Sequence, residues 1–137
     1  AYARGGKTRT PAPARPDCKK IVTDFLAAME ARKLEEASSA LGEGFKMHFP
    51  GASPMEKLSE LVNWAKNRYR SVKKSISVVE AFQSGQTTIV FVHGTLSGEW
   101  PDGTNFSGIR FIDRFEIEDG LITRQDVWND IAEMRPA

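Results

Sequence analysis

The sequence predicts one α+β domain, in which helices come first and a meander of antiparallel strands follows. Its 137 residues fit a single domain, because a second core would leave each half marginal. Segments before about residue 74 repeat apolar side chains at helical spacing, whereas later segments are strand-like and separated by hairpin turns. This order of elements predicts helices that cover one face of a curved sheet.

The composition is that of a soluble globular protein, with 40% apolar and 27% charged residues. The formal charge of +1 shows no overall field for nucleic acid or a membrane surface. The longest apolar run, around Thr88–Val92, is far shorter than the ~20 residues that span a bilayer, so we expect no membrane contact. The single cysteine, Cys18, excludes an internal disulfide and favours a reducing, cytoplasmic location.

Residues 1–16 are predicted to form a basic arm outside the core. They hold three prolines, two glycines and four basic residues, with no hydrophobic period. Four charges are few for nucleic-acid binding, so a solvated or partner-bound tail is favoured over phosphate contact. Residues 17–137 then form the single folded domain.

Three helices are predicted before residue 74. The first covers about residues 17–31, with Asp17 as its cap, and the second covers residues 33–41 and ends at Gly42. The third begins with Ser53 as cap and Pro54 in the first turn, and Glu56 completes a capping box. Its apolar stripe comprises Leu58, Leu61, Val62, Ala65 and Tyr69, and its Lys- and Arg-rich face is interpreted as solvated.

Five strands are predicted from alternation and turn residues. A short strand covers residues 45–49, and longer ones cover residues 75–82, 87–98, 106–118 and 121–128. The turns are Ser84-Gly85, Pro101-Asp102-Gly103 and Asp119-Gly120.

Asp113 is the polar residue on an otherwise apolar strand face. The odd positions from Ile109 to Ile117 form the buried face, and Phe111 and Phe115 flank Asp113 on it as candidate pocket residues. A buried carboxylate needs a partner, a water-filled cavity or a function, so Asp113 is a candidate catalytic residue. The structural alternative is a bond to Arg110 or Arg114 across a sheet edge, although both arginines belong to the other face.

His93 is predicted to share this face with Asp113. If Glu99 and Asn105 close the preceding loop, Phe91 lies opposite Asp113 and His93 lies opposite Phe111. Diagonal neighbours on one face are about 7–8 Å apart, within reach of a His–Asp pair. A one-residue bulge would move His93 to the other face. The alternative for His93 alone is a satisfied core histidine.

Secondary candidates lie in the short strand and in the last strand. His48 could line a cleft, and Asp126 is either a second acid/base group or an ion-pair partner of Arg124. Trp128 is a candidate pocket residue, but Trp64, Trp100 and Trp128 are typical of core and loop anchors. Phosphate-binding, dinucleotide, zinc-protease and serine-hydrolase motifs are absent, so we expect no cofactor and no metal.

The segments from Gly94 to Thr104, from Arg110 to Ile122 and from Asp126 to Asp130 resemble the SnoaL-like branch of the nuclear transport factor 2 superfamily. The resemblance covers about residues 17–134, and its most specific part is DRFEIEDGLI leading to DVWND. It implies a cone-shaped α+β barrel around a deep apolar pocket, commonly in a homodimer. The apolar residues Phe106 and Ile112 favour such a second copy.

The resemblance implies two functions of different kinds. One is a cofactor-independent isomerase, cyclase or lyase, in which Asp113 moves a proton beside the carbonyl of a small apolar compound and His93 polarises the oxygen. The other is a binding or dimerisation module that holds a hydrophobic ligand without chemistry. Epoxide hydrolases of this superfamily carry Arg-x-Asp where this chain has His93-Gly94-Thr95, which argues against that activity.

Overall fold

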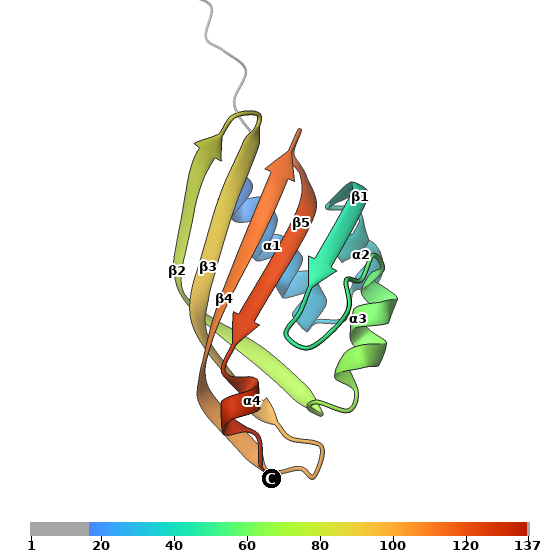
Figure 1. Cartoon of the computed structure of the whole chain (residues 1–137), viewed down its shortest axis with the longest axis vertical. Coiled ribbons are helices and arrows are strands. Elements are labelled where there is room, and N and C mark those ends of the chain that lie inside the picture. Colours follow the sequence, from blue (N-terminus) through green and yellow to red (C-terminus); the bar gives the residue numbers. More distant parts are fainter. Residues whose placement is uncertain (1–16, 137) are drawn as a thin grey trace, which may run out of the picture.

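Five strands form one strongly curved, mostly antiparallel sheet, as seen in the computed structural model, which describes residues 17–136 (Figure 1). The helices are α1 (Cys18–Glu30), α2 (Leu34–Ser38), α3 (Leu58–Ala65) and α4 (Ile131–Met134). The strands are β1 (Leu41–His48), β2 (Ser71–Ser84), β3 (Thr87–Glu99), β4 (Asn105–Glu118) and β5 (Leu121–Asn129), in the spatial order β1-β5-β4-β3-β2. The predicted α+β class is confirmed; the predicted arm of residues 1–16 lies outside the described residues.

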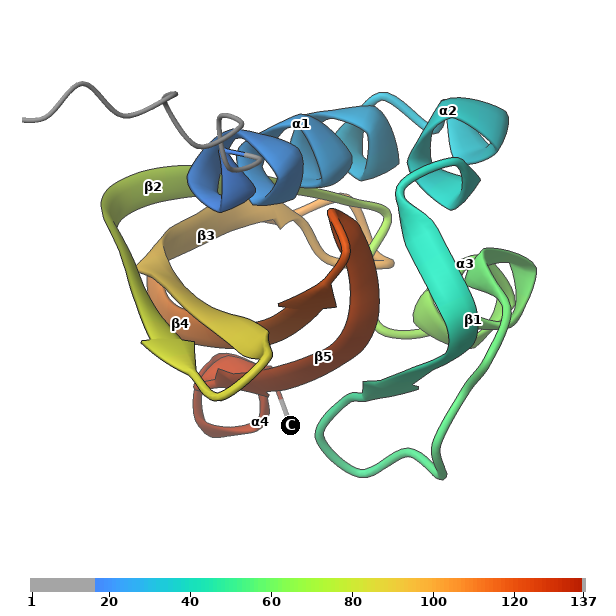
Figure 2. The same cartoon turned by 90° about the horizontal axis from the view of Figure 1, so that it is seen from above.

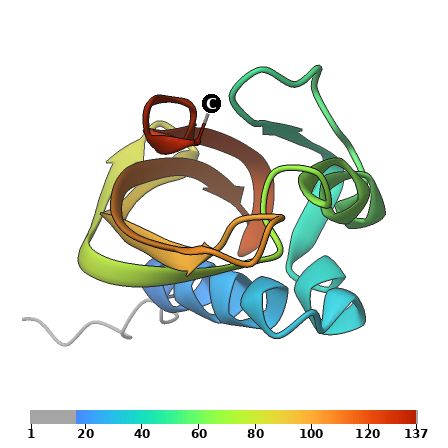
Figure 3. The same ribbon diagram turned by 90° about the horizontal axis from the view of Figure 1, so that it is seen from below.

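Helix α1 closes the hollow side of the sheet (Figures 2 and 3). Its stripe of Val22, Phe25, Leu26 and Met29 is buried, and the Phe25 ring meets Phe115 of β4 edge-on at a centroid distance of 6.0 Å. Burial of each large apolar side chain stabilises the fold by about 2 kcal/mol. Among the helices of residues 17–136, none has the length and apolar content needed to cross a bilayer.

The helix starts were predicted with mixed success. Asp17 caps α1 as predicted, because its carboxylate accepts from the backbone N–H of Lys20 at 3.1 Å. The start of α3 at Ser53-Pro54 was wrong, since Met55 is held in a β-bridge with Met47 and the chain stays extended there. The helix begins at Leu58, and the Glu60 carboxylate accepts from two backbone N–H groups just before it.

A bulge in β4 overturns the predicted pairing of His93 with Asp113. Glu99 does pair with Asn105, as predicted, but the register shifts before Leu96 pairs with Ile109. The extra residue belongs to β4, where Gly108 adopts a φ of +72°. Beyond the bulge, Val92 lies opposite Asp113 and His93 lies opposite Ile112. His93 therefore faces the outside of the sheet and Asp113 faces the inside.

A second bulge in β5 explains why neither phase of that strand is cleanly apolar. The register against β4 shifts between Ile122 and Arg124, which makes Thr123 the extra residue. Ile122, Gln125 and Val127 are therefore all buried on the inner side of the sheet. Asp126 faces outward, opposite Arg114.

Replacing Gly108 with alanine is expected to lower the free energy of unfolding by about 1 kcal/mol, because a left-handed φ costs a Cβ-bearing residue roughly that much. An added Cβ would meet no atom within 4 Å, so backbone strain is the expected cause. Urea unfolding would measure the loss. Gly108→Asn should lose less, since asparagine tolerates this conformation better. Equal losses for both variants would contradict a conformational origin.

Candidate functional site

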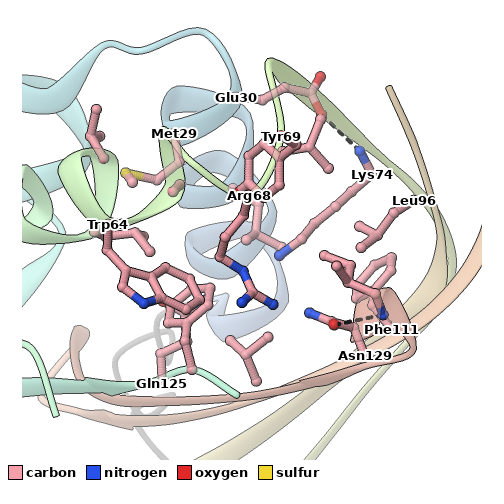
Figure 4. A pocket seen from close by; sticks show the side chains of 18 of the residues that line it. Met29, Glu30, Trp64, Arg68, Tyr69, Lys74, Leu96, Phe111, Gln125 and Asn129 are labelled. Atoms are coloured by element: carbon pink, nitrogen blue, oxygen red, sulfur yellow. Dashed lines mark hydrogen bonds between the residues drawn. The ribbon is translucent and has the colours of Figure 1, made fainter. Parts of the chain in front are cut away.

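A cavity of about 90 Å³ lies between α1, α3 and the inner side of the sheet (Figure 4). Most of its lining is apolar and comes from Phe25, Leu26, Met29, Phe49, Leu61, Val62, Trp64, Ala65, Tyr69, Val72, Leu96, Phe111, Val127 and Ile131. The polar part of its lining is Glu30, Arg32, Arg68, Lys74, Gln125 and Asn129. An apolar wall with a few convergent polar groups is typical of a small-molecule site.

Lys74 and Asp113 form an ion pair at this cavity. The Lys74 Nζ lies 2.5 Å from Oδ2 of Asp113, whose side chain has no exposed surface. Lys74 lines the cavity and its side chain is 22% exposed, so Lys74, and not Asp113, is the member of the pair that a ligand can contact. Burial raises the pKa of Asp113 above its usual range, while the charge of Lys74 and the amide of Gln125 oppose that rise.

Neighbouring elements hold Lys74 in this position. The Glu30 carboxylate at the end of α1 accepts a hydrogen bond of 2.9 Å from the backbone N–H of Lys74. The Lys74 Nζ also lies 5.0 Å from the centroid of the Phe111 ring, a cation–π distance. Helix α1 thus holds the backbone of Lys74, and strand β4 holds its ammonium group.

Arg68 brings a second cation to the cavity. Its guanidinium carbon lies 4.4 Å from the centroid of the Trp64 ring. Its Nε is buried and has no hydrogen-bond acceptor among residues 17–136. Burial is the main cause that lowers the pKa of Arg68, and the nearby charge of Arg135 adds to it. Figure 4 shows the guanidinium of Arg68 pointing into the cavity between Trp64 and Asn129.

Two buried oxygens near the ion pair also lack a donor. Among the described residues, neither Oδ1 of Asp113 nor Oε1 of Gln125 accepts a hydrogen bond. A buried acceptor without a donor costs about 1–3 kcal/mol. The inner side of the sheet thus holds buried acceptors without a donor as well as the cations of Lys74 and Arg68.

The structure brings only part of the predicted site to this cavity. Phe111 lines it, Asp113 lies behind Lys74, and Phe115 is fully buried in the core. His93 and Trp128 instead line a shallow groove on the outer side of the sheet, where Trp128 is 53% exposed. The predicted His93–Asp113 pair is therefore wrong. Neither alternative partner of Asp113 holds, since Arg110 pairs with Asp130 and Arg114 with Glu116.

His48, Arg124 and Asp126 lie together on the outer side of the sheet. The Arg124 Nε donates to Oδ2 of Asp126 at 2.9 Å. Of the two roles predicted for Asp126, this contact corresponds to the ion pair with Arg124. The His48 Nδ1 lies 3.2 Å from Oδ1 of Asp126, and Arg114 completes the cluster at 3.6 Å. Within residues 17–136, no three His, Cys, Asp or Glu side chains gather in a way that could hold a metal ion.

Lys74, Arg68 and the pocket role of Trp64 were not predicted from the sequence. Arg68 lies on the Lys- and Arg-rich side of the predicted third helix, which was interpreted as solvated, and Lys74 directly precedes the long strand predicted from residue 75. Two signals were available. Lys74 shares a strand phase with the apolar Val72, and Arg68 follows Trp64 by four residues, one helical turn.

The profile of the SnoaL-like domain matches residues 22–125. The chain belongs to the SnoaL-like family. This match spans α1 to the middle of β5 and therefore includes most of the residues that line the cavity and both members of the Lys74–Asp113 pair. A search of curated proteins finds no significant match for this SnoaL-like chain.

Solved structures support the nuclear transport factor 2-like fold. An NTF2-like protein of unknown function from Burkholderia pseudomallei K96243 superimposes with a TM-score of 0.68 at 16% identity, covering 88% of this chain and 95% of that one. TerC co-crystallised with polyporic acid gives a TM-score of 0.67 at 14% identity, covering 85% and 93%. A candidate SnoaL-like polyketide cyclase from Jannaschia sp. CCS1 gives 0.62 at 11% identity, covering 92% and 100%. At these identities the likeness establishes the fold alone.

Proposed function

We propose that this SnoaL-like domain is an acid/base enzyme for a small, mainly apolar carbonyl compound, with Lys74 and Asp113 as its reactive pair. The observation that carries the proposal is an ammonium open to an apolar cavity and backed at 2.5 Å by a fully buried carboxylate. Lys74 takes the part that the sequence-based hypothesis gave to His93. Isomerases, cyclases and dehydratases all use such proton transfer.

Lys74 would polarise the substrate. When its ammonium donates to the carbonyl oxygen, electron density shifts toward that oxygen and the hydrogens on the neighbouring carbon become more acidic. The apolar walls around Phe111 and Leu96 exclude water, which strengthens this interaction.

Asp113 would accept the proton. As Lys74 turns toward the substrate, Asp113 loses part of its counter-charge, and burial already raises the pKa of this carboxyl toward the range of a useful base. The proton passes from carbon to a carboxylate oxygen and returns at the same or another carbon, so no atoms are gained or lost. This step requires the ammonium to leave Oδ2 of Asp113, because the carboxylate has no exposed surface while the pair is closed.

Two comparisons support a small organic ligand. One structure of the same fold holds polyporic acid, and another protein of that fold is a candidate polyketide cyclase. A cavity of about 90 Å³ is smaller than the roughly 300–1,000 Å³ of drug-sized pockets, so the ligand would be small or would displace side chains.

The second candidate function is ligand binding without chemistry. The full enclosure of Asp113 favours it, because a carboxylate that stays behind Lys74 could orient the ammonium without reaching a substrate carbon. The site would then hold a ligand through Lys74 and the apolar walls alone.

Hydrogen–deuterium exchange distinguishes the two functions. Cyclopentanone and acetophenone would be incubated with the protein in D₂O, and loss of the proton signals beside the carbonyl would be followed by NMR. We expect faster exchange with the wild type than with buffer, and a loss of at least ~100-fold in Asp113→Asn, since general acid–base catalysis contributes about 10²–10⁴-fold.

Asp126→Asn is the matched control, because it alters a buried carboxylate on the opposite side of the same sheet. Circular dichroism would establish that each variant is folded. If the ketones bind but their exchange is no faster than in buffer, the enzyme proposal is wrong and ligand binding without chemistry takes its place. Unchanged exchange in a folded Asp113→Asn variant would remove Asp113 from the mechanism.

The homodimer and the cytoplasmic location stay predictions. Sedimentation equilibrium of the purified chain would decide the first, with a monomer at micromolar concentration counting against it.

A further inference from the structure

Arg68 presents a guanidinium to the cavity without an acidic partner among residues 17–136. We infer that the ligand of this pocket carries a carboxylate, which binds to Arg68, while the rest of the ligand lies against the apolar walls. This inference rests on the proposed function of the pocket as a small-molecule site. It specifies that the ligand is negatively charged, which the proposed carbonyl chemistry does not determine.

The charges that line the cavity do not balance. Among residues 17–136, Glu30 is the only acidic residue that lines it, against the cations Arg32, Arg68 and Lys74. Glu30 is engaged with the backbone of Lys74, and Lys74 is paired with Asp113. When the buried Asp113 is included, the site holds three cationic side chains and two carboxylates, so one positive charge is not balanced.

Of the three cations, Arg68 is the one whose side chain has no hydrogen-bond acceptor and no acidic partner among residues 17–136. The Nη1 of Arg32 donates to the carbonyl oxygen of Met29 at 2.7 Å, so that side chain is tied to the end of α1. Lys74 is held by Asp113. Arg68 has a buried Nε without an acceptor, and Arg135 adds positive charge beside it instead of neutralising it.

The geometry suits a planar anion. The guanidinium carbon of Arg68 lies 4.4 Å from the centroid of the Trp64 ring, and the buried Nε has no acceptor among the described residues. A guanidinium edge binds a carboxylate with two parallel hydrogen bonds. In Figure 4 the side chains of Arg68, Lys74 and Asn129 converge on one space, so a carboxylate at Arg68 would place the remainder of the ligand near the Lys74–Asp113 pair. The competing explanation is that Arg68 only packs against Trp64.

The probes are benzoate and benzamide, which share one shape and differ in charge. Each would be titrated at neutral pH into the ¹⁵N-labelled chain of residues 1–137, and the amide and indole resonances around the cavity would be followed. We expect the wild type to bind benzoate about tenfold to hundredfold more tightly than benzamide, the range for hydrogen bonds to a charged group. Arg68→Met should abolish this preference. Arg68→Lys should keep part of it, because an ammonium keeps the positive charge but cannot form the two parallel hydrogen bonds of a guanidinium.

Arg70→Met is the control, because Arg70 is a nearby, exposed arginine that pairs with Glu99 and does not line the cavity. It should keep the wild-type preference. Equal binding of both probes to the wild type would overturn the inference and leave the pocket standing. A preference that survives in Arg68→Met would do the same. Failure of both probes to shift the cavity resonances would overturn the ligand pocket and this inference together. The wild-type ratio decides the matter even if Arg68→Met fails to fold.

Discussion

Replacing Lys74 with methionine is expected to lower the free energy of unfolding by about 3 kcal/mol at neutral pH, since breaking a buried ion pair leaves one charge uncompensated. Asp113 would remain fully buried beside a neutral side chain and would lose the positive charge that is paired with it. Urea unfolding monitored by circular dichroism would measure the loss. Lys73→Met is the control, because Lys73 is the adjacent, exposed residue of β2 and should change stability by less than about 0.5 kcal/mol.

The loss in Lys74→Met should depend on pH. Burial raises the pKa of Asp113 in the folded state, and removal of Lys74 takes away the largest opposing cause. Between the unfolded pKa, about 3.9, and the higher folded pKa, the folded protein binds more protons than the unfolded one, so stability falls as pH rises through that window. The deficit against the wild type should therefore be small near pH 4 and grow toward neutrality. A deficit that is constant with pH would contradict this account.

Replacing Gly94 with alanine should also cost about 3 kcal/mol, the upper end of the usual range for overpacking. An added Cβ at Gly94 would lie 2.0 Å from the carbonyl oxygen of Ser75 and 2.9 Å from the backbone nitrogen of Ser77. Both contacts are with the backbone of β2, next to its register shift between Ile76 and Val78, so β2 and β3 would have to separate. Because Ser75 follows Lys74, the ion pair would be disturbed as well.

Gly51→Ala is the matched control for this prediction. Gly51 has a φ of +76° and no atom within 4 Å of an added Cβ, so it should lose only the roughly 1 kcal/mol of backbone strain. Thermal unfolding of the two variants would compare them directly. A Gly94→Ala protein as stable as Gly51→Ala would show that the strands adjust without cost.

The meander was predictable from the sequence because its signals are local. Alternation identified the four long strands, and the turn at Asp119-Gly120 joins β4 to β5 with both residues at positive φ. The two bulges were not predictable. A glycine such as Gly108 is compatible with a regular strand or with an extra residue, and the choice depends on how the whole sheet curls. One extra residue was enough to reverse the face of His93.

The site was predictable only in part, for the same physical reason. Asp113 was found because a carboxylate on an apolar face is a local anomaly. Its partner comes from β2, which is separated from β4 by β3, and the two side chains meet only because the sheet is strongly curved. No local pattern distinguishes Lys74 from the exposed Lys73 until that curvature is known.

The parallel pairing of β1 with β5 has a consequence for how the chain acquires its structure. β1 pairs only with β5 in this sheet of residues 41–129. β1 lies far earlier in the sequence than β5, and so do the helices α1, α2 and α3. On the ribosome, the N-terminal half therefore emerges before the strand that it must join. Until residues 121–129 are synthesised, β1 has no neighbouring strand to pair with in the sheet. The nascent chain is thus expected to complete its sheet only after residues 121–129 have left the ribosome.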